Sequence, residues 1–200
     1  MKKQPKVLII GQPNVGKSTL INRILKKKHS ITLEQPGVTR DLIHIQAYWK
    51  DIPFMLIDSG GVWFNEKKEN TLQQLIESKI IKTLDIVDKI IFVTDLKEDI
   101  HNIDHQIAKI LQPYKEKVIL TVNKIDIKHN PETLNNYHQL GLGAPHGISA
   151  SHGQGIRTLL EALTKTFSEK TIPEIAANLS IVGRPNVGKS SLINVLLQSN

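Results

Sequence analysis

Residues 11–18 read Gly11-Gln12-Pro13-Asn14-Val15-Gly16-Lys17-Ser18 and fit the pattern G-x-x-x-x-G-K-[ST]. The apolar run 7–10 precedes them and predicts a short buried strand, while residues 19–25 carry apolar side chains at helical spacing. A strand, a glycine-rich loop and a helix in this order predict a phosphate site, because backbone N–H groups and the helix N-terminus converge on one point. Lys17 is expected to reach the β- and γ-phosphates of a nucleotide, and the Ser18 hydroxyl to ligate Mg²⁺. Glycine-rich turns also join strands to helices where no phosphate binds. The phosphate site therefore has to be supported by other motifs in the chain.

The composition is that of an ordinary globular protein. Of the 200 residues, 40% are hydrophobic and 22% are charged, which suits one α/β domain with some chain left over. The absence of cysteine excludes disulfides and thiolate metal sites. No apolar stretch approaches the roughly 18 residues that a membrane span needs, so we expect a cytoplasmic protein without a membrane partner. The net charge of +7 permits a nucleic-acid partner, but the few aromatic residues argue against a stacking platform for single strands.

Strands and helices are predicted to alternate along most of the chain. Residues 42–49 and 53–57 predict a hairpin, and a helix is expected over 71–84. The other strands are expected at 90–93, 118–122 and 147–149, and the other helices at 103–111, 131–140 and 156–167. This pattern predicts an α/β fold with a mostly parallel six-stranded sheet, helices on both faces and one antiparallel edge strand.

Three further segments follow predicted strands. Asp58-Ser59-Gly60-Gly61 would place a carboxylate near Mg²⁺ and a glycine N–H near the γ-phosphate, although the same residues also form a good turn. In Asn123-Lys124-Ile125-Asp126, the Asp126 carboxylate could accept hydrogen bonds from guanine N1–H and N2–H₂, which adenine lacks, and the Lys124 stem would lie along the base. Ser149-Ala150 would offer the Ala150 N–H to guanine O6. Their common position at one edge of the sheet predicts a guanine-nucleotide site, with an ATPase as the weaker alternative.

These segments, together with Thr39, resemble the five G-boxes of Ras-like P-loop GTPases. More narrowly, residues 12–20, residues 36–41 and a second loop at 183–192 resemble the Der (EngA) family of bacterial GTPases, which carry two G-domains in tandem. The resemblance implies a P-loop NTPase fold of the Ras-like G-domain type. It also implies a nucleotide-binding set made of Gly11, Asn14, Val15, Gly16, Lys17, Ser18, Thr19, Asp58, Gly61, Asn123, Lys124, Asp126, Ser149 and Ala150.

The resemblance assigns catalytic roles to Lys17, Asn14, Thr39 and Gly61. It implies Mg²⁺ held by Ser18, Thr39 and Asp58, and K⁺ held by Asn14. Many GTPases carry a glutamine directly after the glycine that corresponds to Gly61, and this glutamine orients the attacking water. In this chain Val62 stands at that position. The resemblance implies that the Der family shares this departure and uses a bound K⁺ instead. Two smaller departures are Gln12, where the family usually has arginine, and Ser59, where it usually has threonine.

The activity implied by the resemblance is slow, Mg²⁺-dependent and K⁺-stimulated hydrolysis of GTP to GDP and phosphate. The family acts in assembly of the large (50S) ribosomal subunit, so the ribosome or its RNA is an expected partner besides GTP and GDP. The alternative is a nucleotide-binding fragment with negligible turnover and no ribosomal role, because the family's second G-domain and C-terminal KH-like domain are not complete in these 200 residues.

The domain organisation follows from the repeated loop. Residues 1–168 are expected to form the first G-domain, 169–178 a linker, and 179–200 the start of a second G-domain. The second, partial P-loop is assigned to Gly183, Asn186, Gly188, Lys189 and Ser190.

Two weaker patterns lie outside this set. His101 and His105 have the i, i+4 spacing of a helical metal site, but a solvated surface is the favoured interpretation. Trp63-Phe64 fits either a docking patch or a buried anchor for its loop.

Overall fold

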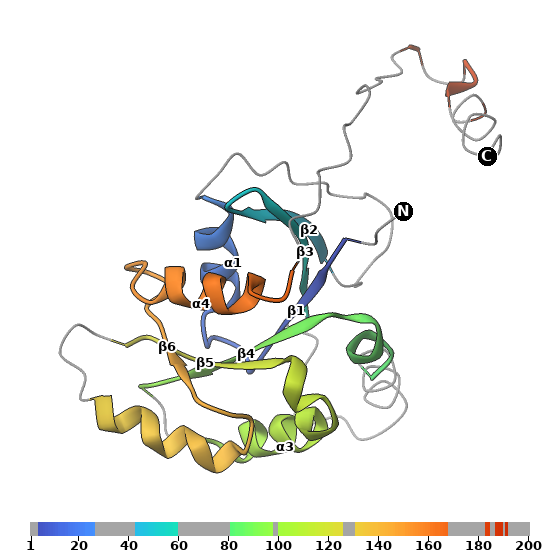
Figure 1. The fold of residues 1–200 in the computed structure, drawn as a ribbon. Helices are drawn as coiled ribbons and strands as arrows, with labels where there is room; N and C mark the ends of the chain where they lie inside the picture. Colours follow the sequence, from blue (N-terminus) through green and yellow to red (C-terminus); the bar gives the residue numbers. More distant parts are fainter. Residues whose placement is uncertain are drawn as a thin grey trace. The chain divides into compact units, whose positions relative to one another are not determined.

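The computed structural model describes residues 4–26, 43–59, 81–97, 100–125 and 131–167, and in the C-terminal segment residues 183–184, 187–189 and 191. Within these residues, six strands form one sheet in the order β2-β3-β1-β4-β5-β6 (Figure 1). The strands are β1 (Lys6–Ile10), β2 (Ile43–Trp49), β3 (Ile52–Asp58), β4 (Lys89–Asp95), β5 (Val118–Asn123) and β6 (His146–Gly147). All neighbours pair in parallel except β2 and β3, which are antiparallel. The predicted sheet with one antiparallel edge strand is therefore confirmed.

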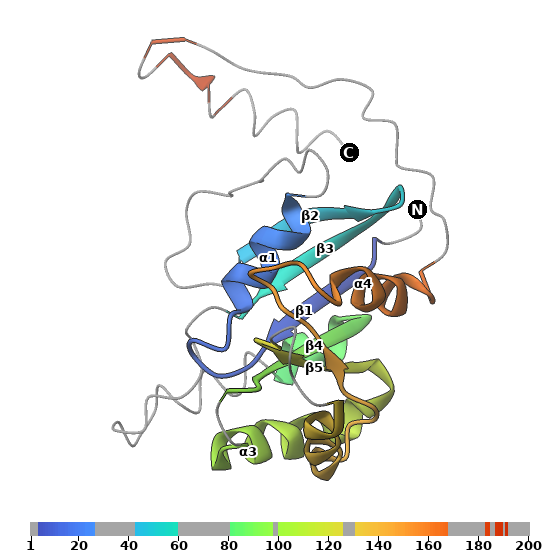
Figure 2. The same ribbon diagram turned by 90° about the vertical axis from the view of Figure 1, so that its left-hand side faces the viewer.

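Helices cover both faces of the sheet (Figures 1 and 2). On one face lie α1 (Lys17–Leu25) and α4 (Ile156–Thr164), and on the other lie α3 (Asn102–Leu111), the 3-10 helix η1 (Gln112–Lys117) and the 3-10 helix η2 (Pro131–Leu140). The alternation of strand β1 shows why two layers are needed: Val7 and Ile9 pack with α1 and α4, whereas Leu8 and Ile10 pack with α3 and η2. A strand that is apolar on both faces has to be covered on both.

Several element bounds differ from the prediction for local reasons. The helix expected over 131–140 is a 3-10 helix, η2. Its inward-facing residues Leu134, Tyr137 and Leu140 recur every three positions, and a helix with three residues per turn places such a row on one face. The helix expected to reach Phe167 ends at Thr164, where the threonine hydroxyl donates to the Leu160 carbonyl at 2.8 Å.

The last strand and the helix before β4 also differ from their predicted ranges. Strand β6 covers His146–Gly147, and Ser149 instead forms an isolated bridge with Gln154. Residues 81–86 are helical, two residues beyond the predicted end at Leu84, while the earlier part of that predicted helix lies outside the described residues. Trp63-Phe64 lies outside them too.

The chain divides into two compact units, Met1–Lys170 and Thr171–Asn200. The sheet and its helices belong to the first unit. The assignment of 169–178 to a linker and of 179–200 to the start of a second G-domain stays a prediction.

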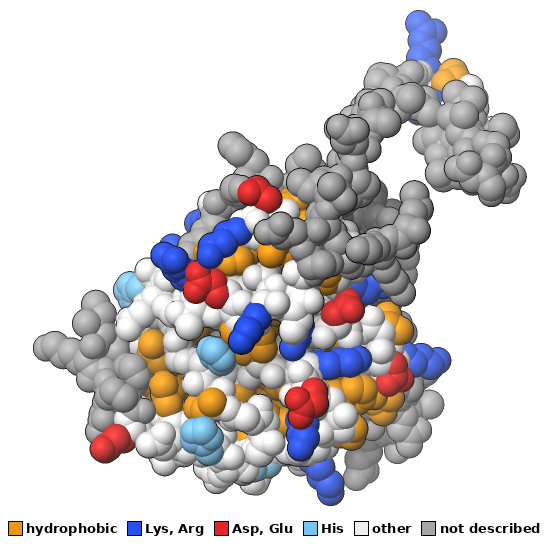
Figure 3. Space-filling model, viewed as in Figure 1, with side chains coloured by type: hydrophobic (Ala, Val, Ile, Leu, Met, Phe, Trp, Pro, Cys, Tyr) orange, Lys and Arg blue, Asp and Glu red, His pale blue; other side chains and the backbone are white. Residues whose placement is uncertain are grey.

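Charge is mixed on the surface of the first unit. On the face shown in Figure 3, Lys and Arg side chains lie among Asp and Glu side chains. The net charge of +7 is therefore not gathered into one basic patch on this face, and by itself it does not indicate a nucleic-acid surface there. None of the helices in the described part of the chain has the length and apolar character that crossing a bilayer requires.

Candidate nucleotide-binding site

The predicted site residues meet at the carboxyl edge of the parallel strands. Residues 11–18, here called the P-loop, follow β1, and Asp58 ends β3 opposite Ile9 of β1. Asn123 ends β5 and Ser149 follows β6. Parallel strands end at the same edge, and loops at this edge form the usual ligand crevice of open α/β sheets.

Two glycines let the P-loop backbone pass close to its neighbours. Gly11 has a φ of 153°, and a Cβ there would come within 2.1 Å of the Val93 carbonyl oxygen. Gly16 has a φ of 97°, and a Cβ there would come within 2.3 Å of the Asn123 side-chain nitrogen. Only glycine fits both the backbone conformation and the space. The loop therefore packs directly against β4 and against the Asn123 side chain.

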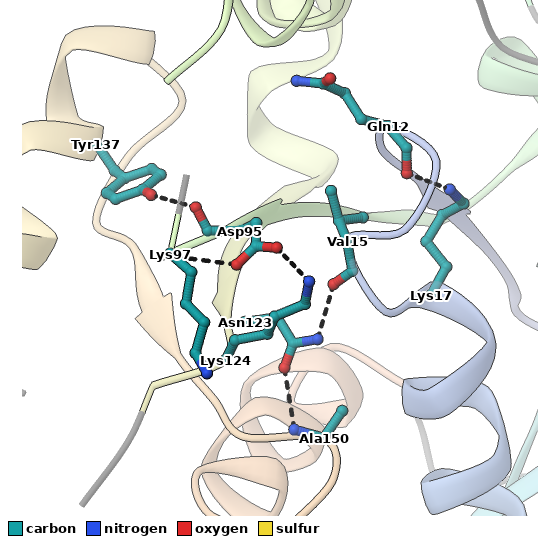
Figure 4. A network of polar contacts seen from close by, with 9 residues as sticks. All are labelled: Gln12, Val15, Lys17, Asp95, Lys97, Asn123, Lys124, Tyr137 and Ala150. Carbon is teal, nitrogen blue, oxygen red and sulfur yellow. Dashed lines mark hydrogen bonds and ion pairs between the residues drawn. The ribbon is translucent and has the colours of Figure 1, made fainter. Parts of the chain in front are cut away.

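Lys17 is held inside the curve of the P-loop. Its side chain is buried, with 7% of the residue exposed. The Nζ atom donates to the Gly11 carbonyl at 2.8 Å. It also donates to the Gln12 carbonyl at 2.6 Å (Figure 4). Burial lowers the pKa of Lys17, and the negative charge of Asp58 opposes that shift. The ammonium group of Lys17 is therefore fixed at the loop that is expected to hold phosphates. The Asp58 carboxylate is close enough to influence its pKa.

Asn123 joins the P-loop to the loop after β6. The residue is 2% exposed. Its Nδ2 donates to the Val15 carbonyl at 2.8 Å, and its Oδ1 accepts from the Ala150 N–H at 3.0 Å (Figure 4). One amide thus joins the predicted phosphate-binding loop to the predicted base-binding loop. The Ala150 N–H, predicted to serve guanine O6, is engaged by Asn123 in this structure.

Arg23 of α1 adds a second connection to the loop after β6. Its Nε donates to the Ala150 carbonyl at 2.9 Å, and a terminal guanidinium nitrogen donates to the Ser151 carbonyl. Within that loop the Gly153 N–H donates to the Ser149 carbonyl at 2.6 Å. The helix that begins at the P-loop therefore also supports the segment that is expected to read the base.

Lys124 lies beside Asn123 in an uncommon conformation. Its φ is 65°, in the left-handed region that few non-glycine residues adopt. The next residue is fixed by a hydrogen bond from the Ile125 N–H to the Ile148 carbonyl at 3.0 Å. The Lys124 Nζ forms an ion pair with Asp95 at the end of β4.

The described oxygen donors suit Mg²⁺. Ser18 is exposed at the start of α1, and Asp58 is partly exposed at the end of β3. A hydroxyl and a carboxylate are hard oxygen ligands of the kind that Mg²⁺ prefers. Thr39, the third predicted Mg²⁺ ligand, lies outside the described residues.

Of the remaining predicted site residues, the structure describes some and not others. Gly61 and Asp126 lie outside the described residues, while Asn14 and Thr19 are exposed at the P-loop and at the start of α1. Asn14 also has a positive φ, 65°. His101 and His105 lie at the start of α3. Among the described residues, no group of three or more His, Cys, Asp or Glu side chains is arranged to hold a metal ion.

The second P-loop repeats the local contacts of the first. Lys189 Nζ donates to the Gly183 carbonyl at 2.9 Å and to the Arg184 carbonyl at 2.6 Å. Gly188 has a φ of 87°, close to the 97° of Gly16. Asn186 and Ser190 lie outside the described residues. The same sequence pattern thus produces the same lysine position in both units.

Sequence reasoning missed Arg23 and Asp95. Arg23 and its partners stand 127 and 128 positions apart, and no local pattern links residues at such separations. Asp95 had a usable signal, since a carboxylate at the end of a buried apolar strand requires a partner.

Comparison with known proteins identifies the class. The profile of a family described as 50S ribosome-binding GTPase matches residues 6–124 and 178–200. The chain therefore belongs to the family of 50S ribosome-binding GTPases, and it has the P-loop GTPase fold.

Within this class the chain is similar to proteins named GTPase Der. It is 41% identical over 197 residues to GTPase Der of Aquifex aeolicus (strain VF5), a match that covers 96% of this chain and 45% of the relative. It is also 41% identical over 203 residues to GTPase Der of Limosilactobacillus reuteri (strain DSM 20016), covering 98% and 45%. The chain thus spans less than half the length of these relatives. The predicted resemblance to the Der family is confirmed.

A solved structure of Era in complex with MgGDPNP and a segment of 16S ribosomal RNA also matches. The TM-score is 0.66 at 27% identity, and the match covers 88% of this chain and 61% of that one.

Proposed function

We propose that this chain binds GTP and GDP at the carboxyl edge of its sheet and hydrolyses GTP to GDP and phosphate. The observation that carries the proposal is the Asn123 side chain, which bonds the P-loop at Val15 and the Ala150 loop at once. In this proposal one buried amide holds the loop that would bind the phosphates next to the loop that would read the base. Membership of a GTPase family and similarity to an Era that binds MgGDPNP support the same ligand class.

The residues of the proposed site would bind the phosphates and two kinds of cation. Lys17 leaves the Gly11 and Gln12 carbonyls to neutralise the β- and γ-phosphates, while the loop N–H groups hold their oxygens. Ser18, Asp58 and Thr39 would hold Mg²⁺, which would supply positive charge to offset the charge of the phosphates. The Asn14 amide oxygen would hold K⁺ beside the phosphates, where a cation stabilises the developing charge. The Gly61 N–H would face the γ-phosphate.

The hydrolysis proposal is tested by turnover in K⁺ and in Na⁺. We expect GTP to be hydrolysed slowly, faster in K⁺ than in Na⁺, and the difference to disappear in Asn14→Ala. Equal rates in both salts would contradict the role of Asn14. No turnover above buffer in either salt, with GDP still bound, would favour the binding-only alternative.

Guanine selectivity is tested at Asp126. Asp126→Asn removes the charged acceptor for N1–H and N2–H₂, so GTP affinity should fall by about 100-fold or more. Comparable ATP and GTP turnover by the unchanged protein would support the ATPase alternative instead.

A role in assembly of the large ribosomal subunit is the third part of the proposal, and it would place the protein in the cytoplasm. It is supported by the family's description and by similarity to proteins named GTPase Der, of which this chain spans 45%. Co-sedimentation with purified 50S subunits should occur with a non-hydrolysable GTP analogue and weaken with GDP. Absence of co-sedimentation in both states would contradict a ribosomal role for this chain.

A further inference from the structure

A buried carboxylate lies against the predicted base-binding lysine. Asp95 is the last residue of β4, and its side chain is only 4% exposed. In the parallel pairing of β4 and β5 it stands directly opposite Asn123. The carboxylate therefore lies at the edge of the sheet where the base is expected (Figure 4).

Both carboxylate oxygens and the main chain of Asp95 are engaged. Oδ1 accepts from the Lys97 N–H at 3.0 Å, Oδ2 pairs with Lys124 Nζ, and the carbonyl accepts from the Tyr137 hydroxyl at 2.7 Å. The next residue pairs with β5, since the Leu96 N–H donates to the Asn123 carbonyl at 2.9 Å. These contacts fix the position of the Asp95 carboxylate, so the carboxylate determines where the Lys124 ammonium group lies.

The two side chains of the Asp95–Lys124 ion pair differ in their exposure to solvent. Asp95 is inside the protein, whereas the Lys124 side chain is 36% exposed. A buried carboxylate requires a partner, but a lysine at the surface would otherwise sample many rotamers. Asp95 therefore selects one position for the ammonium end of Lys124, and the left-handed backbone at Lys124 fixes the other end. The aliphatic stem is stretched between two fixed points.

We propose that Asp95 is a positioning residue for recognition of the purine base. It holds the Lys124 stem as a preformed apolar surface on which the base stacks, so the rotamer entropy of the lysine is lost on folding and not on binding. This inference rests on the proposed nucleotide site. It adds a specificity element that is not part of the P-loop or of the segment 123–126.

The test is a double-mutant cycle read by GDP titration. Asp95→Asn preserves the size of the side chain and an oxygen for the Lys97 N–H. It should weaken GDP binding about tenfold in the unchanged background and less than about twofold in a Lys124→Met background. Pyrophosphate, which has no base, should compete equally well before and after the change. Asp85→Asn is the matched control, because that carboxylate accepts from the Tyr114 hydroxyl at 2.6 Å on the surface.

Equal losses with and without Lys124, or a parallel loss of pyrophosphate affinity, would show a general structural role and overturn the inference. An unchanged GDP affinity would overturn it too. Failure of the unchanged protein to bind GDP would instead refute the proposed function.

A second measurement needs no change at Asp95. In ¹⁵N-lysine NMR spectra of the GDP complex, the Nζ resonance assigned by its loss in Lys124→Met should be protected from exchange. A rapidly exchanging Lys124 ammonium in that complex would overturn the inference.

Discussion

Gly16 combines a backbone constraint with a close contact to Asn123. Gly16→Ala would place a methyl group 2.3 Å from the Asn123 nitrogen at a φ of 97°. We expect it to lower the free energy of unfolding by about 2–4 kcal/mol, from left-handed strain plus overpacking. GDP affinity should fall as well, because Asn123 would be displaced from Val15 and Ala150.

The matched control is Gly143→Ala. Gly143 has a φ of 92° but no atom within 4 Å of an added Cβ. It should therefore show only the backbone cost, about 1–2 kcal/mol, and unchanged GDP affinity. Urea denaturation and titration of both variants separate the two effects, and equal behaviour of the two variants would contradict the Gly16–Asn123 contact.

Asp104 is a buried carboxylate in the first turn of α3. It is 3% exposed, and burial raises its pKa above the ordinary 3.8, while the Gln12 side chain, the His101 N–H and the nearby His101 and His105 oppose that shift. At pH 7 the folded state carries the full cost of a buried charge. As the pH falls through the raised pKa, the folded state takes up the proton before the unfolded state does, and this cost disappears.

Asp104→Asn should therefore stabilise the protein at pH 7, with an advantage that shrinks as the pH falls toward 4. The asparagine oxygen can still accept from the His101 N–H, a contact of 3.1 Å in the unchanged protein. Urea denaturation of both proteins at pH 7 and pH 4.5 checks this. An advantage that is the same at both pH values, or a less stable variant at pH 7, would contradict the account.

At the scale of elements, α1 contributes to both ends of the proposed site. Its first residue is Lys17, and Arg23, six residues later, donates to the Ala150 and Ser151 carbonyls. Arg23→Ala should lower stability by about 0.5–1.5 kcal/mol and GDP affinity by about threefold to tenfold, because the base loop loses its support.

Arg157→Ala is the control for loss of an arginine. Arg157 pairs with Glu161 on the exposed face of α4, with its side chain 74% exposed. Its removal should change stability by less than about 0.5 kcal/mol and leave GDP affinity unaltered. Thermal unfolding and GDP titration of the two variants check this, and an Arg23→Ala protein with normal GDP affinity would contradict the role of α1.

The elements were predictable where periodicity is strong. Strand β1 and helix α1 follow from an apolar run and a helical spacing of apolar residues around the glycine loop. The type of η2 was missed because apolar residues at three-residue spacing also fit the predicted α-helix over so short a range. The early end of α4 was missed because Phe167 is buried like Leu163 and so continues the helical spacing of apolar residues past Thr164.

At the scale of the molecule, the sheet and the edge that carries the site were predictable, since alternating strands and helices admit few topologies. Because each motif is local in sequence, the P-loop, Asp58, Asn123, Lys124 and Ala150 were recognisable as candidate site residues, and their roles stay predictions. The residues that position them were not recognisable. Arg23 and Asp95 act across tertiary contacts. An arginine at position 23 fits an exposed surface equally well, and the position of Asp95 at the end of a buried strand indicates that it needs a partner but not which residue that partner is.

The most direct test of the central claim, one guanine-nucleotide site per chain, is a calorimetric titration of nucleotide-free protein with GDP in Mg²⁺ buffer. ADP serves as the parallel ligand. We predict one GDP bound per chain and no detectable binding of ADP. Absence of GDP binding, equal affinity for ADP, or two GDP per chain would contradict the account, the last by giving the Gly183–Lys189 loop a site of its own.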